Sequence, residues 1–169
     1  RRSADLPFAK VYAEARRLGF KTSVHAGEAA GSESVWGALQ DLEVDRIGHA
    51  TRAREDIALL EHLEKEATPL ELCPLSNVAT GVIPSYKDHP VHQYWQHGLN
   101  ITINTDDPGM FHNHLTDEYM GLMDHFHFAP DDIRQLILNA LECSWRPTNG
   151  PQSSLTKQFQ SHPNWKLPQ

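Results

Sequence analysis

The stretch Val24-His25-Ala26-Gly27-Glu28 places an imidazole and a carboxylate directly after a short run that is typical of a strand. Three later stretches show the same pattern, in which a short apolar run ends in polar, chemically capable groups: Arg46-Ile47-Gly48-His49, Leu70-Glu71-Leu72-Cys73-Pro74 and Ile101-Thr102-Ile103-Asn104-Thr105-Asp106-Asp107-Pro108. Because the carboxyl ends of parallel strands meet at one face of a fold, we expect all four ends to form one site.

Segments with helical periodicity separate these four strands. Apolar residues recur at spacings of three and four, and glycine, proline or acidic residues mark several helix ends. Helices are predicted over 6–18, 32–42, 51–66, 90–97 and 116–125, and from 130 onward. In the third helix Ile57, Leu60 and Leu63 are expected to face inward, and residues 76–81 are expected to form an extended loop.

Alternation of strand and helix predicts an α/β fold with a parallel sheet. Doubly wound sheets and (β/α)8 barrels share this pattern, but polar groups at the carboxyl end of every strand favour the barrel. Four βα units make only half of such a barrel. We therefore expect residues 1–146 to form the C-terminal half of a TIM barrel with additional C-terminal helices, and the Pro-, Ser- and Gln-rich residues 147–169 to form an irregular tail.

Composition excludes several classes of protein. The chain has 169 residues, of which 39% are hydrophobic and 22% charged, as in an ordinary globular domain. A formal charge of -7 disfavours a nucleic-acid partner. No apolar run approaches the roughly 20 residues that span a membrane, and no signal peptide is apparent. Cys73 and Cys143 form no C-x-x-C motif, so a reducing, cytoplasmic location is expected.

The spacing of His25 and Glu28 indicates a metal ligand beside a proton carrier. A turn at Gly27 would carry the carboxylate back over the opening into which the imidazole points. Catalytic zinc commonly takes His and Asp ligands and keeps one position open for water, so Asp106 is the expected second ligand from this chain. Taken singly, a His at a strand end is more often a structural hydrogen-bonding group.

The remaining polar ends have matching expected roles. Glu28 would shuttle a proton, His49 would orient or deprotonate the attacking water, and Asp107 would hydrogen-bond the substrate. An Asp-Asp-Pro sequence is by itself usually only a turn. Chance, however, rarely places a His, a second His and an Asp pair at the same end of three strands.

Four motifs of the chain resemble those of the adenosine deaminase family. They are His25-Ala26-Gly27-Glu28, Arg46-Ile47-Gly48-His49, Leu72-Cys73-Pro74-Leu75-Ser76-Asn77 and Asn104-Thr105-Asp106-Asp107-Pro108. The resemblance is to its bacterial adenosine/adenine deaminase branch, within the amidohydrolase superfamily, and covers residues 6–145. It implies a (β/α)8 barrel of the metallo-dependent hydrolase type with one Zn²⁺. The implied reaction replaces the 6-amino group of a purine by water and releases ammonia.

The resemblance also implies a role for each site residue. His25 and Asp106 correspond to zinc ligands, and Glu28 to the proton donor for the purine ring nitrogen. His49 corresponds to the group that activates and holds the attacking hydroxide. Asp107 corresponds to a substrate contact, and the backbone at Gly27 to a point of close approach to the purine.

Two departures from the family pattern stand out. Ala50 replaces the glycine that usually follows the second histidine, and no His-x-His pair precedes His25 to supply the other two zinc ligands. The pairs His112/His114 and His125/His127 are poor substitutes, because both follow the last ligand and residues two apart on a helix point in nearly opposite directions. Surface positions are expected for His62, His89, His92, His97 and His162.

The sequence leaves three possibilities open. The first possibility is that the chain is the C-terminal half of a zinc-dependent deaminase of adenosine or a close 6-aminopurine, whose missing N-terminal half completes the barrel. The substrate is alternatively adenine or an aminofutalosine-type nucleoside. The last alternative is an inactive half-barrel, which would expose two strand edges and an apolar barrel interior, and would bind no zinc tightly.

Overall fold

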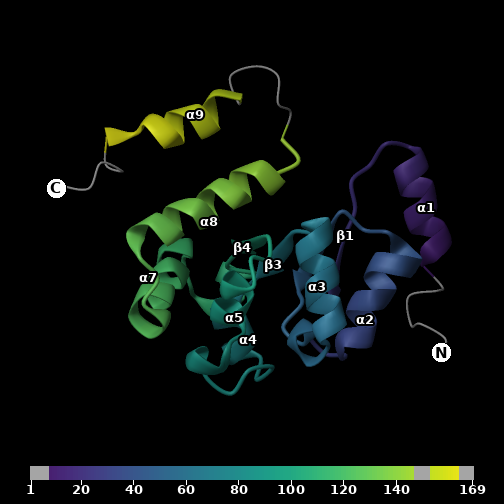
Figure 1. Cartoon of the computed structure of the whole chain (residues 1–169), viewed down its shortest axis with the longest axis horizontal. Coiled ribbons are helices and arrows are strands. Elements are labelled where there is room, and N and C mark those ends of the chain that lie inside the picture. The colour runs from purple at the N-terminus through teal and green to yellow at the C-terminus, as the bar shows by residue number, and fades with distance from the viewer. Residues whose placement is uncertain (1–7, 147–152, 164–169) are drawn as a thin grey trace.

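The centre of the molecule is a four-stranded parallel sheet formed by β1 (Ser23–Ala26), β2 (Arg46–His49), β3 (Leu70–Leu72) and β4 (Ile101–Ile103) (Figure 1). This computed structural model describes residues 8–146 and 153–163. The strand order is β1-β2-β3-β4, so each strand pairs with the next one in the chain. A doubly wound sheet reverses its strand order at a switch point, whereas a barrel segment does not. The order therefore supports the predicted half-barrel.

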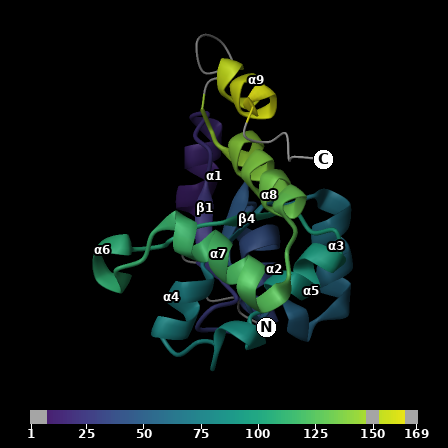
Figure 2. The same cartoon turned by 90° about the vertical axis from the view of Figure 1, so that its left-hand side faces the viewer.

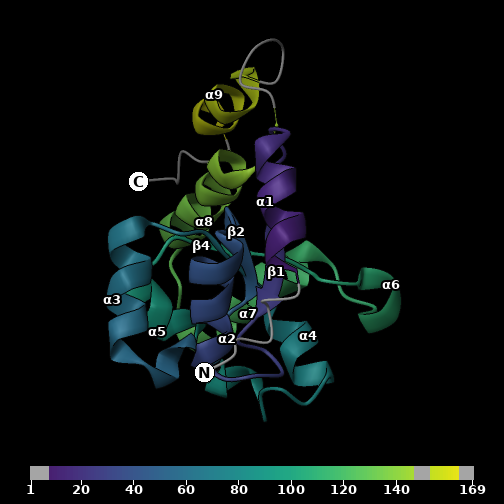
Figure 3. The same ribbon diagram turned by 90° about the vertical axis from the view of Figure 1, so that its right-hand side faces the viewer.

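The bounds of the helices are α1 Ala9–Arg17, α2 Ser32–Gly37, α3 Ile57–Glu66, α4 Pro74–Ala79, α5 Val91–Gln96, α6 Pro108–Phe111, α7 Leu115–Phe126, α8 Pro130–Cys143 and α9 Ser153–Ser161. The predicted helices are present as α1, α2, α3, α5, α7 and α8, whereas α4, α6 and α9 were not predicted. A π-helical turn at 38–42 continues α2, and short 3-10 turns lie at 53–55 and 86–88. The short α6 projects from the rest of the chain (Figures 2 and 3).

Helix α8 illustrates how local sequence fixes an element. Pro130 occupies the first helical position, where its missing N–H is not needed, and the Asp132 carboxylate accepts a hydrogen bond from the Ala129 N–H at 2.8 Å. Ile133 and Leu136 are buried, as expected. The helix packs on β4, where the Asn139 amide donates to the Ile101 carbonyl at 3.2 Å.

Apolar side chains of the sheet pack against the helices, while polar side chains occupy the opposite face. The core joins Ile47, Leu70 and Ile101 to buried leucines of α3 and α8. On the other face Glu71 accepts a hydrogen bond from Ser23 at 2.9 Å and pairs with Arg46 at 3.3 Å. The prediction that an isolated half-barrel exposes an apolar interior is therefore wrong for this part of the sheet.

Three local predictions are wrong. Residues 76–81 are not an extended loop, because α4 begins at Pro74, which suits the first position of a helix. Ile57 is 70% exposed, since the buried stripe of α3 runs through Leu59, Leu60 and Leu63, away from Ile57. Part of the predicted irregular tail is α9, which packs against α8. Residues 147–152 and 164–169 of that tail lie outside the described residues.

Both cysteines are free, and burial raises the pKa of the Cys73 thiol, as is typical of a buried structural thiol. Within residues 8–146 and 153–163, none of the helices has the length and apolar character needed to cross a bilayer.

Candidate active site

The carboxyl ends of β1 and β2 bring His25, Glu28 and His49 together. One nitrogen or oxygen of each lies within 4.8 Å of those of the other two. The two imidazole rings are perpendicular, with centroids 4.7 Å apart, and His49 Nε2 lies 3.5 Å from a Glu28 carboxylate oxygen. His25 pairs with Gly48 in the sheet register, and a side chain at Gly48 would meet the His25 ring at 2.5 Å. A glycine at position 48 thus leaves room for the His25 ring.

Gly27 forms the turn that carries Glu28 back toward the site. Its φ of 68° lies in the left-handed region that glycine adopts without strain. The Gly27 N–H donates to Ser34 Oγ at 2.8 Å, and its carbonyl accepts from the Thr51 hydroxyl at 2.7 Å and the Arg52 N–H at 2.8 Å. Both backbone groups are thus engaged inside the protein, and a contact between Gly27 and substrate stays a prediction.

The backbone at His49 and Ala50 is also left-handed, with φ of 64° and 52°. Glycine adopts this conformation without strain, whereas an alanine at position 50 does so only at a cost. Ala50 is nevertheless fully buried and its carbonyl accepts from the Tyr94 hydroxyl at 2.7 Å. Burial lowers the pKa of His49, and the nearby carboxylates of Glu28 and Asp106 offset only part of that shift. His49 is therefore neutral at pH 7.

Asp106 and Asp107 follow β4 and point to different partners. Ser76 Oγ, on α4, donates to Asp106 Oδ2 at 2.6 Å. Asp106 does not belong to the group formed by His25, Glu28 and His49. Asp107 is the N-cap of α6, and its carboxylate accepts from the Met110 N–H at 2.9 Å.

The alternative histidine pairs do not join the site. Both members of His112/His114 and of His125/His127 are exposed and lie outside the metal-capable group found in the described part of the chain.

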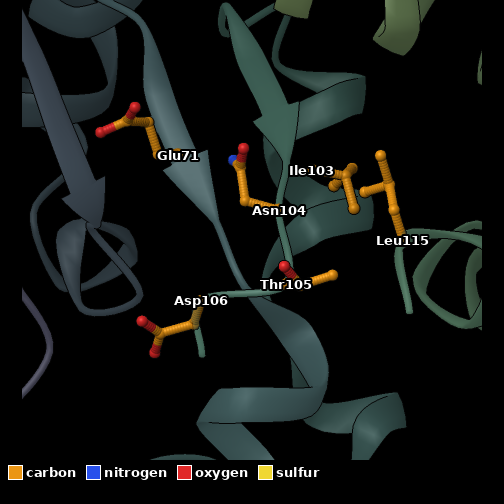
Figure 4. A pocket seen from close by; sticks show the side chains of 6 residues that line it. All are labelled: Glu71, Ile103, Asn104, Thr105, Asp106 and Leu115. Carbon is orange, nitrogen blue, oxygen red and sulfur yellow. The ribbon is translucent and has the colours of Figure 1, made fainter. Parts of the chain in front are cut away.

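A cavity of about 320 Å³ lies beside Asp106, between β3, β4 and the start of α7 (Figure 4). Figure 4 shows Glu71, Asn104 and Asp106 on one side of β4, and Ile103 and Leu115 on the other. The polar side chains that line this cavity, Glu71, Asn104 and Asp106, therefore lie on the same side of β4.

Glu118 anchors α7 beneath the site. It is completely buried, and its carboxylate accepts from the Leu75 N–H at 3.3 Å and the Asn113 amide at 3.1 Å. Burial raises the pKa of this carboxyl to about 7. The contact joins α7 to the first turn of α4, which carries Ser76.

Two residues that the sequence did not single out as functional lie directly behind the site. Asn77 Nδ2 is 3.1 Å from His49 Nδ1 and 3.2 Å from Glu28 Oε1, and Asn77 Oδ1 is 3.3 Å from His89 Nε2. The prediction that His89 is a surface residue is wrong, because it is 3% exposed. The signal in the sequence was that Asn77 ends the motif Leu72-Cys73-Pro74-Leu75-Ser76-Asn77, shortly after the third strand, although no role was assigned to it.

Comparison with known proteins agrees with these features. The family model described as adenosine deaminase matches residues 2–158. The chain belongs to the adenosine deaminase family. Curated relatives of the chain are named adenine deaminase and adenosine deaminase.

Relatives in the adenosine deaminase family carry different names. The chain is 44% identical over 143 residues to an aminodeoxyfutalosine deaminase from Streptomyces avermitilis, covering 85% of this chain and 40% of the relative. It is 36% identical over 152 residues to an adenosine deaminase from Yersinia pseudotuberculosis, covering 90% of this chain and 46% of the relative.

The crystal structure of an adenine deaminase from Arthrobacter aurescens is similar to this chain, with 30% identity and a TM-score of 0.86. The match covers 94% of this chain and 47% of that one. The predicted α/β half-barrel is therefore confirmed. The chain spans less than half the length of the adenosine deaminase relatives that it matches.

Proposed function

We propose that this chain is the C-terminal half of a zinc-dependent deaminase that hydrolyses the 6-amino group of adenosine or a close 6-aminopurine. The oxygen of water forms a bond to purine C6, one of its protons ends on the purine ring nitrogen and the other on the amino group, and the bond from C6 to the amino nitrogen breaks so that ammonia leaves. The observation that carries the proposal is the convergence of His25, Glu28 and His49, whose ligand-capable atoms lie within 4.8 Å of one another at the carboxyl ends of two adjacent strands.

The donor groups at this edge fit zinc. An imidazole from His25 and a carboxylate from Asp106 are ligand types that catalytic zinc uses, and the Ser76 hydroxyl holds one Asp106 oxygen at 2.6 Å. Bound zinc would lower the pKa of a water molecule at its open position to about 7. The other ligands would come from the part of the barrel that this chain does not span, in keeping with its coverage of 40% to 46% of the two relatives.

Glu28 and His49 form the proton-transfer side of the proposed site. Glu28 would donate a proton to the purine ring nitrogen, which makes C6 a better acceptor for the attacking oxygen. His49 would hold the attacking oxygen by a hydrogen bond. Asp107 would hydrogen-bond the substrate, and the glycine at position 27 would let the purine approach the backbone.

The test uses the complete reading frame that contains this chain, purified with zinc. Adenosine, adenine and aminodeoxyfutalosine are supplied separately, and ammonia release is measured together with the change in purine absorbance. We expect release from at least one substrate, and a loss of about 100- to 10,000-fold in kcat for Glu28→Gln. The matched control, Glu61→Gln on the exposed face of α3, should keep the parent rate.

Two results would overturn the proposal. One is the absence of ammonia release from all three substrates, and the other is an unchanged rate for Glu28→Gln.

Two observations distinguish the proposed enzyme from an inactive half-barrel. They are the zinc content and activity of the isolated 169-residue chain, and the coding sequence upstream of it. We expect the isolated chain to hold much less than one zinc per molecule and to leave adenosine unchanged, because it supplies only part of the ligand set. An upstream strand that ends in His-x-His would support the intact enzyme. Full zinc occupancy with turnover by the isolated chain would contradict the proposed division of ligands.

A further inference from the structure

A buried asparagine and a buried histidine are linked by contacts to Glu28 and His49. Asn77 is on α4 and is completely buried, while His89 precedes α5 and is 3% exposed. His89 contacts the backbone of α5 and the Asn77 side chain. The Asn77 amide in turn contacts both the His49 ring and Glu28. Because both side chains are buried, contacts within the protein determine their orientations.

The protonation of His89 follows from its two contacts. His89 Nδ1 accepts a hydrogen bond from the Val91 N–H at 3.1 Å, so this nitrogen carries no proton. Burial lowers the pKa of His89 to about 3, and the ring is neutral at pH 7. A neutral imidazole carries one proton, which must then lie on Nε2. This N–H donates to Asn77 Oδ1 at 3.3 Å.

The orientation of the Asn77 amide follows in turn. Its oxygen faces His89, so its NH₂ group faces the site, where it donates to Glu28 Oε1 at 3.2 Å. The contact from Asn77 Nδ2 to Glu28 Oε1 agrees with this orientation, because a carboxyl oxygen can accept from the amide NH₂ group. The second hydrogen of the NH₂ group donates to His49 Nδ1 at 3.1 Å. All polar atoms of the Asn77 side chain are then used.

We propose that Asn77, held by His89, is a positioning residue that fixes His49 in the tautomer with its proton on Nε2. His49 Nε2 lies 3.5 Å from Glu28 Oε2, so His49 presents a hydrogen-bond donor beside the Glu28 carboxylate. The role of these residues in the reaction rests on the proposed function, whereas the tautomer itself does not.

This arrangement decides between two roles for His49. Its only lone pair is occupied by Asn77, so His49 Nε2 has none with which to bind a metal or take a proton from water. In this tautomer His49 holds the attacking oxygen by donating to it. Of the three residues that could hold a metal ion, only His25 and Glu28 then keep a free ligand atom.

The direct test is ¹⁵N NMR of the histidine rings in the 169-residue chain, without metal or substrate, at pH 7. We expect His49 and His89 both to show a protonated Nε2 and an unprotonated Nδ1. A proton on Nδ1 of His49 in the parent chain would overturn the proposal. The measurement needs no activity, so it separates failure of the tautomer assignment from failure of the proposed deaminase.

Variants test whether Asn77 and His89 fix the tautomer of His49. Asn77→Leu removes the donor to His49 Nδ1, and His89→Leu removes the group that orients the amide, so both should shift the His49 signals toward a mixture of tautomers. His89→Gln retains a donor to Asn77 and should restore the parent pattern. His92→Leu, a half-buried histidine of α5 stacked on Phe126, is the matched control and should leave His49 unchanged.

Activity provides the second readout in the complete protein. Loss of a residue that orients a catalytic group is expected to lower kcat by about 10- to 100-fold, with a smaller change in KM. Circular dichroism first establishes that each variant is folded. A folded Asn77→Leu variant that keeps the parent His49 tautomer and the parent kcat would contradict the proposed positioning role.

Discussion

Replacing Gly27 by alanine should destabilise the chain much more than the same change at another glycine with positive φ. A methyl group at Gly27 would meet Val35 Cγ2 at 2.7 Å and the Ala50 backbone at 3.1 Å. Overpacking of this kind costs about 1 to 3 kcal/mol. The left-handed backbone, with φ of 68°, adds about 1 to 2 kcal/mol, and the lower entropy of the unfolded alanine chain offsets about 0.4 to 1 kcal/mol. We expect a total loss of about 2 to 4 kcal/mol.

Gly81 supplies the matched comparison for the unfolding experiment. Its φ is 72°, but a methyl group there would meet nothing within 4 Å, so Gly81→Ala should lose only about 1 kcal/mol. Urea unfolding followed by circular dichroism measures both. With a slope of about 2 kcal/mol/M, a difference of about 2 kcal/mol separates the two midpoints by about 1 M.

A double-mutant cycle then identifies the steric part of the loss. In a Val35→Ala background the 2.7 Å contact is absent, so Gly27→Ala should cost about 1 kcal/mol less there than in the parent chain. Equal losses at Gly27 and Gly81, or an unchanged loss in the Val35→Ala background, would refute this account of the turn.

Two further predictions concern the support of the site. Ser76→Ala should weaken zinc binding by the complete protein about 10- to 100-fold in a chelator competition, because the hydroxyl holds Asp106; Ser85→Ala, an exposed control, should not. The raised pKa of Glu118, about 7, means that the folded state binds this proton more tightly, so its stabilisation is complete below about pH 4.5 and is lost as the pH rises through 7. Glu118→Gln should remove that decline in urea midpoint between pH 4.5 and 7.5, whereas Glu61→Gln should retain it.

The sheet was predictable because its signals are local. Short apolar runs between helical segments marked the strands, and β2, Arg46–His49, has the predicted bounds. Parallel order then required the strand ends to meet, which correctly placed His25 beside His49. The helix over 130–143 was equally clear, since proline and acidic residues begin it and apolar residues repeat along one side.

The support behind the site could not be predicted, because it depends on contacts between distant residues. Asn77 and Glu28 are separated by 49 positions, and no pattern around either residue indicates the other. His89 looked like a surface residue next to a proline, but hydrogen bonds to both ring nitrogens compensate for its burial. Helix α9 lies in a segment whose composition suggested irregular chain, and it packs against α8.

If Asn77 fixes the His49 tautomer, metal binding and proton transfer separate within the proposed site. Glu28, the proposed proton donor, and His49, which would hold the attacking oxygen, both accept hydrogen bonds from Asn77 of this chain, whereas the metal would take only His25 and Asp106 from it. Glu28→Gln should therefore lower kcat by about 100- to 10,000-fold while leaving zinc affinity nearly unchanged, and His25→Ala should lower both. Asn77 thus fixes two groups of the proposed site, and neither of them is one of the two proposed metal ligands of this chain.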